Sequence, residues 1–465
     1  MSNKLARVSI STGETPNDAL REGITNLGGI SQFIGENEKV FIKINLNMPT
    51  GFPSNVNLDT LCEVIRLCKQ AGAQKIYVGS FAFENFTVKK VSDELGLSEF
   101  IEFNEGELAY LDNSDKIGTI KLSDEDKLQL QPDSFREIEI LDSRILYPQT
   151  ILDSDKLICI NQVNVHPVFD INLAVLNLYS CIHYKYRRIS HDSSKEKSAL
   201  GSDQFRSNLV AKIFDVYNVK KPNLVINDLF YFMEGAGPFI YKDSKIKLTK
   251  YIISGNDAVA TDYITLKILG LEPRSNPIIS YARKKKMGTT QPEKINLFGE
   301  KIDDIDIGFK PCAKKLEDIN LQKFVIKKGV SCSGCFLHAY YLLNFIKSLL
   351  IKDLNYLPNC SFLMGENPLE PEESTEIILF GDCAINSTIN RDFRIIKKEG
   401  RNIKSFFLKK EILYKTNKKM LPIPGCPPNL IYDNFNLILK YFKKSNLPTL
   451  NFYMKNLKFI PKSES

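Results

Sequence analysis

The chain has 465 residues, of which 43% are hydrophobic and 25% charged, and its net charge is +7. This composition is ordinary for a globular protein of two or three domains, and no apolar run reaches the ~20 residues that a membrane-spanning helix needs. No secretory leader precedes the first strand-like residues, so we expect a cytoplasmic protein, in which ten cysteines indicate metal binding or catalysis before disulfides.

Residues 1–310 alternate between strand and helix patterns. Pro16 suits the first turn of a helix, and Asp257 suits the cap of another. The alternation predicts an α/β domain with a parallel sheet and right-handed crossovers, ending near residues 305–325. The predicted helices cover residues 15–27, 59–71, 205–218 and 258–269. The predicted strands cover residues 39–45, 75–79, 157–160, 224–226 and 251–253.

Three of the four histidines lie between residues 166 and 191. Open α/β sheets bind ligands at the carboxyl ends of their strands, and histidine titrates near neutrality. If Lys43, His166 and His191 lie at such ends, they could handle the charge and protons of a substrate. The alternative is that these histidines are exposed or structurally bonded residues on a loop.

A glycine-rich stretch follows the strand predicted at residues 224–226. It contains Glu234, Gly235 and Gly237, followed by a proline. Glycine lets backbone N–H groups approach a phosphate or carboxylate, so these residues are candidates for cofactor binding. The stretch lacks a dinucleotide fingerprint or a phosphate-binding lysine, and it could equally be a tight turn.

The last third of the chain contains four cysteines in distinctive settings. Cys332 and Cys335 form a C-x-x-C pair, Cys383 follows Gly-Asp, and Cys426 lies in Pro-Gly-Cys-Pro-Pro. Four thiolates are the usual ligands of a 4Fe-4S cluster and of structural zinc. Zinc sites of this kind usually close on two short pairs, whereas here the third and fourth cysteines are single, which favours the cluster. Zinc and ordinary buried cysteines remain the alternatives.

The order C-x-x-C, G-x-C and P-G-C-P-P resembles the proximal-cluster domain of nickel–iron hydrogenase small subunits and a related respiratory subunit, over residues 325–445. The resemblance implies a flavodoxin-like domain at residues 325–465, with a 4Fe-4S cluster held by the four cysteines at the carboxyl ends of parallel strands. The gap between Cys335 and Cys383 is shorter than in that family, and no counterpart of its acidic residue precedes Cys332. The resemblance therefore implies the cluster rather than hydrogenase chemistry.

Residues 1–310 resemble a second family, the "domain of unknown function 362". Many of its members carry iron–sulfur clusters, often in a ferredoxin-type insertion that this chain lacks. Where that family has a K-x-K-x-H run, this chain keeps His166 but has Gln162 and Asn164, which would weaken an anion site. The matching stretches lie at residues 40–46, 71–78, 155–158 with His166 after it, 176–178, 234–238 and 255–262.

From residue 391 to the end, 17 lysines and arginines face 5 acidic residues. This excess predicts either an ordinary solvated surface or a docking face for an acidic electron carrier such as a ferredoxin. No nucleic-acid recognition motif accompanies it. We therefore expect an iron–sulfur oxidoreductase or electron-transfer protein with an unknown small-molecule substrate. The alternative is a binding, assembly or redox-sensing protein with a structural cluster or zinc.

Overall fold

The computed structural model describes residues 5–83, 86–112, 135–140, 143–187, 202–350, 355, 358–372, 375–394 and 420–428. The described residues form two compact units. The first comprises residues 5–187 and 207–312, and the second comprises residues 202–206 and 313–428, each with its gaps. His191 and most of the lysine-rich C-terminal segment lie outside the described residues. No helix in the described ranges is both long and apolar enough to cross a membrane.

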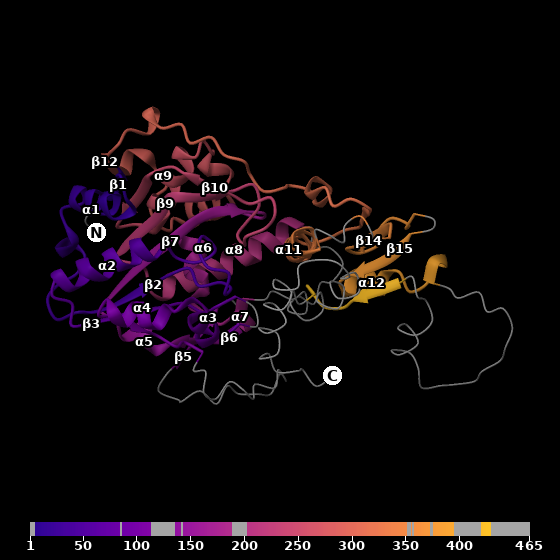
Figure 1. Cartoon of the computed structure of the whole chain (residues 1–465), viewed down its shortest axis with the longest axis horizontal. Coiled ribbons are helices and arrows are strands. Elements are labelled where there is room, and N and C mark those ends of the chain that lie inside the picture. Colours follow the sequence, from indigo (N-terminus) through magenta and orange to yellow (C-terminus); the bar gives the residue numbers. More distant parts are fainter. Residues whose placement is uncertain are drawn as a thin grey trace. The chain divides into compact units, whose positions relative to one another are not determined.

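The first unit is built on one large, mostly parallel sheet (Figure 1). In spatial order its strands are β12 (Ile295–Gly299), β1 (Ala6–Thr12), β11 (Tyr251–Gly255), β9 (Leu224–Glu234), β7 (Lys156–His166), β2 (Lys39–Lys43), β3 (Lys75–Gly79) and β4 (Glu107–Leu108). The run from β9 to β4 is parallel throughout. Two short strands, β8 (Asp170–Asn172) and β10 (Lys245–Leu248), pair antiparallel with β7 and β9.

The central strands β7 and β9 form the core of this sheet. Ten of the eleven residues of β7 are buried, and Leu157 and Ile158 are 0% exposed. Such near-continuous burial is expected of parallel strands whose two faces are both covered by helices. Each fully buried Leu or Ile side chain contributes about 1.5–3 kcal/mol through the removal of apolar surface from water.

Helices cover the two faces of the sheet. α1 (Pro16–Asn26) and α2 (Leu58–Gln70) lie on one face, where Gly23 of α1 sits against Ser11 and Ser254. α6 (Ala174–Leu178) and α9 (Ala258–Ile268) pack against the opposite face. The other described helices of this unit are α3 (Val88–Leu95), α4 (Leu97–Phe103), α5 (Gln149–Asp153), α7 (Tyr184–Arg187), α8 (Ser202–Val219, from residue 207) and α10 (Pro277–Lys285). A separate pair of strands is formed by β5 (Phe135–Ile140) and β6 (Ser143–Pro148).

The parallel part of the sheet changes direction between β2 and β7. From β2 the chain proceeds to β3 and β4 on one side, and then returns to β7 and β9 on the other side. The segments that follow β2 and β7 therefore diverge at the carboxyl edge. Open α/β sheets bind ligands at such a switch point.

The second unit has a four-stranded sheet in which every neighbouring pair is parallel. Its strands lie in chain order: β13 (Phe324–Lys328), β14 (Cys360–Met364), β15 (Glu376–Phe380) and β16 (Met420–Ile423). The long helix α11 (Ser333–Leu349) follows β13, and α12 (Asp382–Ser387) follows β15. This sequential order differs from the order 2-1-3-4-5 of flavodoxin-like sheets. The flavodoxin-like fold predicted for this unit is therefore not confirmed.

Most of the predicted elements are confirmed within a few residues. The prediction of a parallel sheet needs correction at its edges and at β11: β8 and β10 pair antiparallel, and β11 is antiparallel to both β1 and β9. Only β10 lies between β9 and β11, and connections this short, without a crossover helix, produce antiparallel neighbours. The strands predicted at residues 157–160 and 224–226 are also too short, since β7 continues to His166 and β9 to Glu234.

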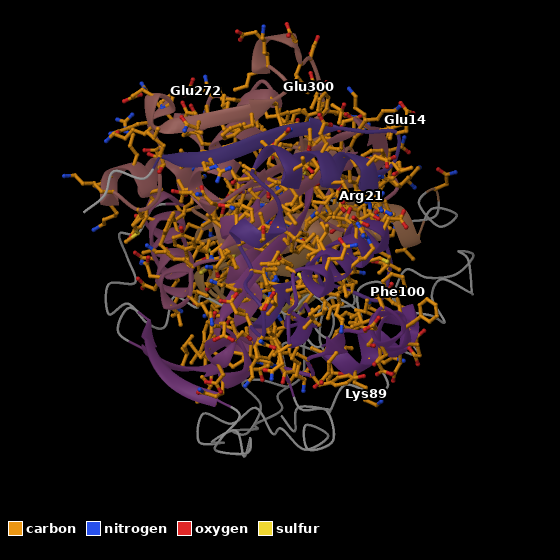
Figure 2. All side chains as sticks on the ribbon, turned by 90° about the vertical axis from the view of Figure 1, so that its left-hand side faces the viewer. Glu14, Arg21, Lys89, Phe100, Glu272 and Glu300 are labelled. Carbon is orange, nitrogen blue, oxygen red and sulfur yellow. The ribbon has the colours of Figure 1, made fainter. Side chains whose placement is uncertain are left out.

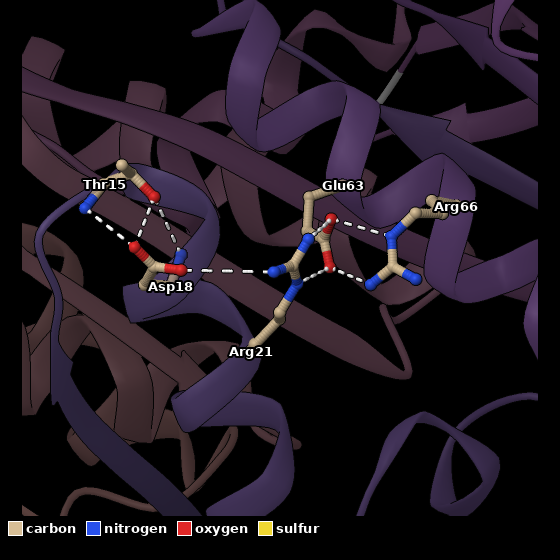
Figure 3. Close-up of polar contacts among 5 residues, drawn as sticks. All are labelled: Thr15, Asp18, Arg21, Glu63 and Arg66. Atoms are coloured by element: carbon tan, nitrogen blue, oxygen red, sulfur yellow. Dashed lines mark hydrogen bonds and ion pairs between the residues drawn. The ribbon is translucent and has the colours of Figure 1, made fainter.

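A cluster of charges joins α1 to α2 (Figure 3). The carboxylate of Glu63 on α2 is 2% exposed and accepts hydrogen bonds from Arg21 of α1 at 2.7 and 3.0 Å and from Arg66. The side chains of Glu14, Lys89 and Glu272, by contrast, lie at the outline of this unit in Figure 2. Burial alone would raise the pKa of Glu63, but the bonds from the two arginines outweigh it and the pKa is lowered.

We predict that Glu63→Gln lowers the free energy of unfolding of the first unit by about 1–2 kcal/mol at pH 7, because it weakens the charged hydrogen bonds from the two arginines. The loss is no larger because solvent screens the half-exposed guanidinium groups. A lowered carboxyl pKa stabilises the fold above the unfolded-state pKa of about 4.3, and the effect disappears as the pH falls through the folded-state pKa. The difference between Glu63→Gln and wild type should therefore shrink below about pH 4 in urea unfolding. Glu293→Gln, at an exposed position, is the matched control, and a difference that does not depend on pH would contradict the assignment.

Candidate functional site

The four predicted metal cysteines follow three strands of the parallel sheet in the second unit. Cys332 and Cys335 come after β13, Cys383 after β15 and Cys426 after β16. Parallel strands all end at the same edge of a sheet, so the sheet brings these segments together although they are far apart in sequence. Two of the segments also begin helices: Cys332 is the N-cap residue of α11, and Cys383 lies in the first turn of α12.

The thiols are hydrogen-bonded in two pairs, Cys335 with Cys332 and Cys383 with Cys426. These bonds and burial raise the pKa values of Cys335 and Cys383. Cys383 and Cys426 also raise the pKa of Cys335 by charge repulsion, and Cys332 does the same for Cys383. All four thiols therefore lie close to one another. In the described part of the chain, no three His, Cys, Asp or Glu side chains are close enough to enclose a metal ion as they stand.

Backbone geometry leaves room beside these thiols. Gly381 has a φ of 89°, and a Cβ atom there would lie 3.7 Å from Cys335 Sγ and 3.5 Å from the Gly425 carbonyl oxygen. The glycine therefore keeps side-chain atoms out of the space between the Cys335 and Cys426 segments. The residues present thus fit a compact group bound by four thiolates.

Two residues outside the predicted set hold the cysteine segments in place. The Gly425 N–H donates to Asp382 Oδ1 at 2.8 Å, and the Asp382 N–H donates to the Gly425 carbonyl at 3.0 Å. His338 Nδ1 lies 2.8 Å from the Pro428 carbonyl oxygen. Sequence reasoning did not identify Asp382, although its position directly before Cys383 was the available signal.

In the first unit, the predicted catalytic residue Lys43 is the last residue of β2 and is fully buried. Its ammonium donates to the Ile44 carbonyl at 2.6 Å and to Asn177 Oδ1 at 2.8 Å. Burial lowers its pKa to about 8, an effect that the nearby thiols of Cys159 and Cys181 partly oppose. Lys43 is thus part of the packed interior, where a substrate from solvent does not reach it.

His166 is the last residue of β7, as the sequence suggested, but it is distant from Lys43. Lys43 pairs with Cys159, and His166 lies seven residues further along the strand, on the order of 20 Å at 3.3 Å per residue. His166 Nδ1 accepts hydrogen bonds from the N–H groups of Val168 and Phe169, both at 3.2 Å, so the proton of the neutral ring is on Nε2. The structure does not bring Lys43 and His166 together, and the role predicted for His191 falls outside the described residues.

The glycine-rich stretch packs tightly against its neighbours. Glu234 Oε2 accepts the Lys310 N–H at 2.9 Å, and the Gly235 N–H donates to the Lys310 carbonyl at 2.7 Å. A Cβ atom at Gly237 would come within 2.4 Å of the Val165 carbonyl oxygen. These contacts give each residue a structural role and leave the Gly235 N–H occupied, so cofactor binding here remains a prediction.

A buried polar network lies between β7, β9 and α9. Asp262 accepts the N–H groups of Ala174 and Val175 at 3.0 and 2.9 Å and the Asn227 amide at 2.9 Å. Burial raises its pKa to about 7, and these bonds partly oppose the shift. Asp257, as predicted, caps α9 through the N–H groups of Val259 and Ala260. Asp262 therefore serves to hold the start of α6 against the sheet.

We predict that Lys43 makes the stability of the first unit rise with pH. Its pKa is about 8 in the folded state, against about 10.4 in the unfolded state, so between these values the unfolded chain binds more protons. Relative to Lys43→Met, wild type should therefore gain about 2–3 kcal/mol as the pH rises across this window. Urea midpoints at several pH values between 7.5 and 9.5 measure this gain, and about half of it should appear over that range. Lys39→Met, at the exposed start of β2, is the control, and parallel profiles for wild type and Lys43→Met would contradict the prediction.

No curated protein matches the chain. The predicted hydrogenase-like resemblance of residues 325–445 accordingly remains a prediction. Residues 40–267, which include β2, β3, β7, β9 and most of α9, match the model of the family described as Domain of unknown function (DUF362), and this match supports the family predicted from the sequence for residues 1–310.

Proposed function

We propose that this protein is an iron–sulfur protein that transfers electrons, with one 4Fe-4S cluster held by Cys332, Cys335, Cys383 and Cys426. The observation that carries the proposal is the convergence of four thiols at the carboxyl edge of one parallel sheet. When bound, such a cluster accepts and donates one electron at a time, at a potential set by burial and by hydrogen bonds to its sulfurs.

The surrounding residues support this proposal through electrostatics. Four thiols so close together resist losing their protons, because each thiolate would repel the others. A bound cationic centre removes this penalty, since metal binding deprotonates thiols. The N-termini of α11 and α12 add favourable interactions with negative charge next to Cys335 and Cys383.

The remaining parts of the protein have narrower roles in this proposal. Asp382 keeps the Cys426 segment against the Cys383 segment, and His338 holds the backbone at Pro428. The electron partner is proposed to be an acidic carrier that meets the lysine-rich C-terminal segment. An oxidoreductase acting on a small molecule is the proposed activity, with His166 Nε2 as a site of proton exchange.

We predict that Cys426→Ala loses the cluster. Protein purified without oxygen should contain about four iron and four sulfide per chain, and dithionite should produce an electron paramagnetic resonance signal. Cys426→Ala should lack the signal and most of the iron, because three thiolates leave one iron without its protein ligand.

Cys360→Ala is the matched control, since Cys360 is a buried cysteine of β14 outside the proposed ligand set. Its iron content and signal should equal those of wild type. One zinc and no iron in the wild-type protein would contradict the electron-transfer proposal and favour a structural or interaction module.

We also predict that Asp382→Ala weakens the cluster without removing a ligand. The substitution leaves the Gly425 N–H without its carboxylate acceptor and loosens the Cys426 segment. Loss of such an outer partner typically lowers metal affinity about 10–100-fold. The measurement is the rate at which a chelator removes iron, with Asp392→Ala as the control. Equal rates for Asp382→Ala and wild type would show that the pairing of Asp382 with Gly425 does not position the cluster ligands.

A further inference from the structure

A second group of polar side chains is buried in the first unit, at the point where β2 and β7 diverge. Gln162 of β7 pairs with Asp228 of β9, so both side chains lie on the same face of the sheet. Asn164 lies two residues further along β7, just past an irregularity in the pairing of β7 with β9. All three residues are 0% exposed. The segment of residues 53–60 covers them, because the Asn164 amide donates to the Pro53 carbonyl at 2.8 Å and the Thr60 hydroxyl donates to Asp228 at 2.5 Å.

The hydrogen bonds fix the direction of both amides. Gln162 Nε2 donates to the Tyr231 carbonyl at 2.8 Å and to the Asp228 carbonyl at 3.4 Å, and Asn164 Nδ2 donates to Pro53. Each nitrogen thus faces a carbonyl oxygen, and rotating either amide would set two acceptors against each other. Within the described ranges, Gln162 Oε1, Asn164 Oδ1 and the Ser54 hydroxyl have no hydrogen-bond partner.

Among the residues that the structure describes, the buried carboxylate of Asp228 has no positively charged hydrogen-bond donor. The donors to the Asp228 carboxylate are all neutral: the Thr60 hydroxyl, the Phe230 N–H at 3.0 Å and the Asn57 side chain. Burial raises its pKa to about 6, and the charged neighbour that acts on it is a second carboxylate, Asp59. A buried carboxylate without a positive partner is costly, and unpaired buried oxygens add to that cost.

We propose that Gln162, Asn164 and Asp228 hold a small metal cation beneath the segment of residues 53–60. The ligands are all oxygen atoms, which favours an alkali or alkaline-earth ion over a transition metal. Because all three side chains are 0% exposed, the proposed ligand is a single ion rather than a larger molecule. The cation would neutralise Asp228, satisfy the two amide oxygens and fasten the segment that follows β2 to β7 and β9.

The test is the melting temperature of the desalted, full-length protein in chlorides of Na⁺, K⁺, Mg²⁺ and Ca²⁺. Choline chloride at the same ionic strength is the reference, because choline is too large for the site. One of the four cations should raise the melting temperature of the wild-type protein by about 5 °C above the reference at saturation. If no cation exceeds choline, the oxygens are satisfied by water alone and the proposal is wrong.

Two variants locate the effect. Asp228→Asn should abolish the shift, and Asn164→Ala should raise the half-saturating concentration about tenfold, because it removes one of the proposed oxygen ligands. Asp262→Asn is the matched control: Asp262 is equally buried but bonds to Asn227, which points to the opposite face of the sheet, so the shift should persist. A full shift in Asp228→Asn would overturn the proposed site. If Asp228→Asn does not fold, an unchanged half-saturating concentration in Asn164→Ala would overturn it.

Discussion

A parallel sheet brings the carboxyl ends of all its strands to one edge, and both units of this protein depend on that constraint. In the second unit it places the segments after β13, β15 and β16 together, although 91 residues separate Cys335 from Cys426. In the first unit the same edge contains the divergence of β2 and β7. Each proposed binding site therefore follows from strand order rather than from a short sequence motif.

Buried polar groups are the second consequence of this architecture. The carboxyl half of β7 and residues 227–228 of β9 carry amides and a carboxylate where most buried strands carry aliphatic side chains. On one face the Asn227 amide donates to Asp262, which also accepts an N–H group at the start of α6, and the Lys43 ammonium donates to Asn177. In the described part of the chain, Gln162 Oε1 and Asn164 Oδ1 have no donor near the buried Asp228 carboxylate, and Asn161 Oδ1 has none beside Asn227. The candidate binding site is thus distinguished by two such oxygens together with a buried carboxylate.

The sequence predicted those features that depend on neighbouring residues. Asp257 caps α9 as expected, and α1 begins at Pro16, because capping and proline preferences act within one turn. The polar run from Asn161 to His166 was expected to lie beyond its strand, yet it continues β7, where its amide nitrogens donate to carbonyl groups of distant segments. The spacing of the cysteines indicated a metal site, but only the strand order brings the four thiols together. Asp228 gave no comparable signal, because its partner Thr60 is distant in sequence.

The central claim is that the four thiols hold iron in a cluster, and X-ray absorption at the iron edge tests it most directly. The sample is the full-length protein purified without oxygen, so that all four cysteine segments are present. The account predicts iron surrounded by sulfur alone, with further iron atoms in the next shell, as in a 4Fe-4S cluster. Iron bound by nitrogen or oxygen, or a protein that contains zinc in place of iron, would contradict it.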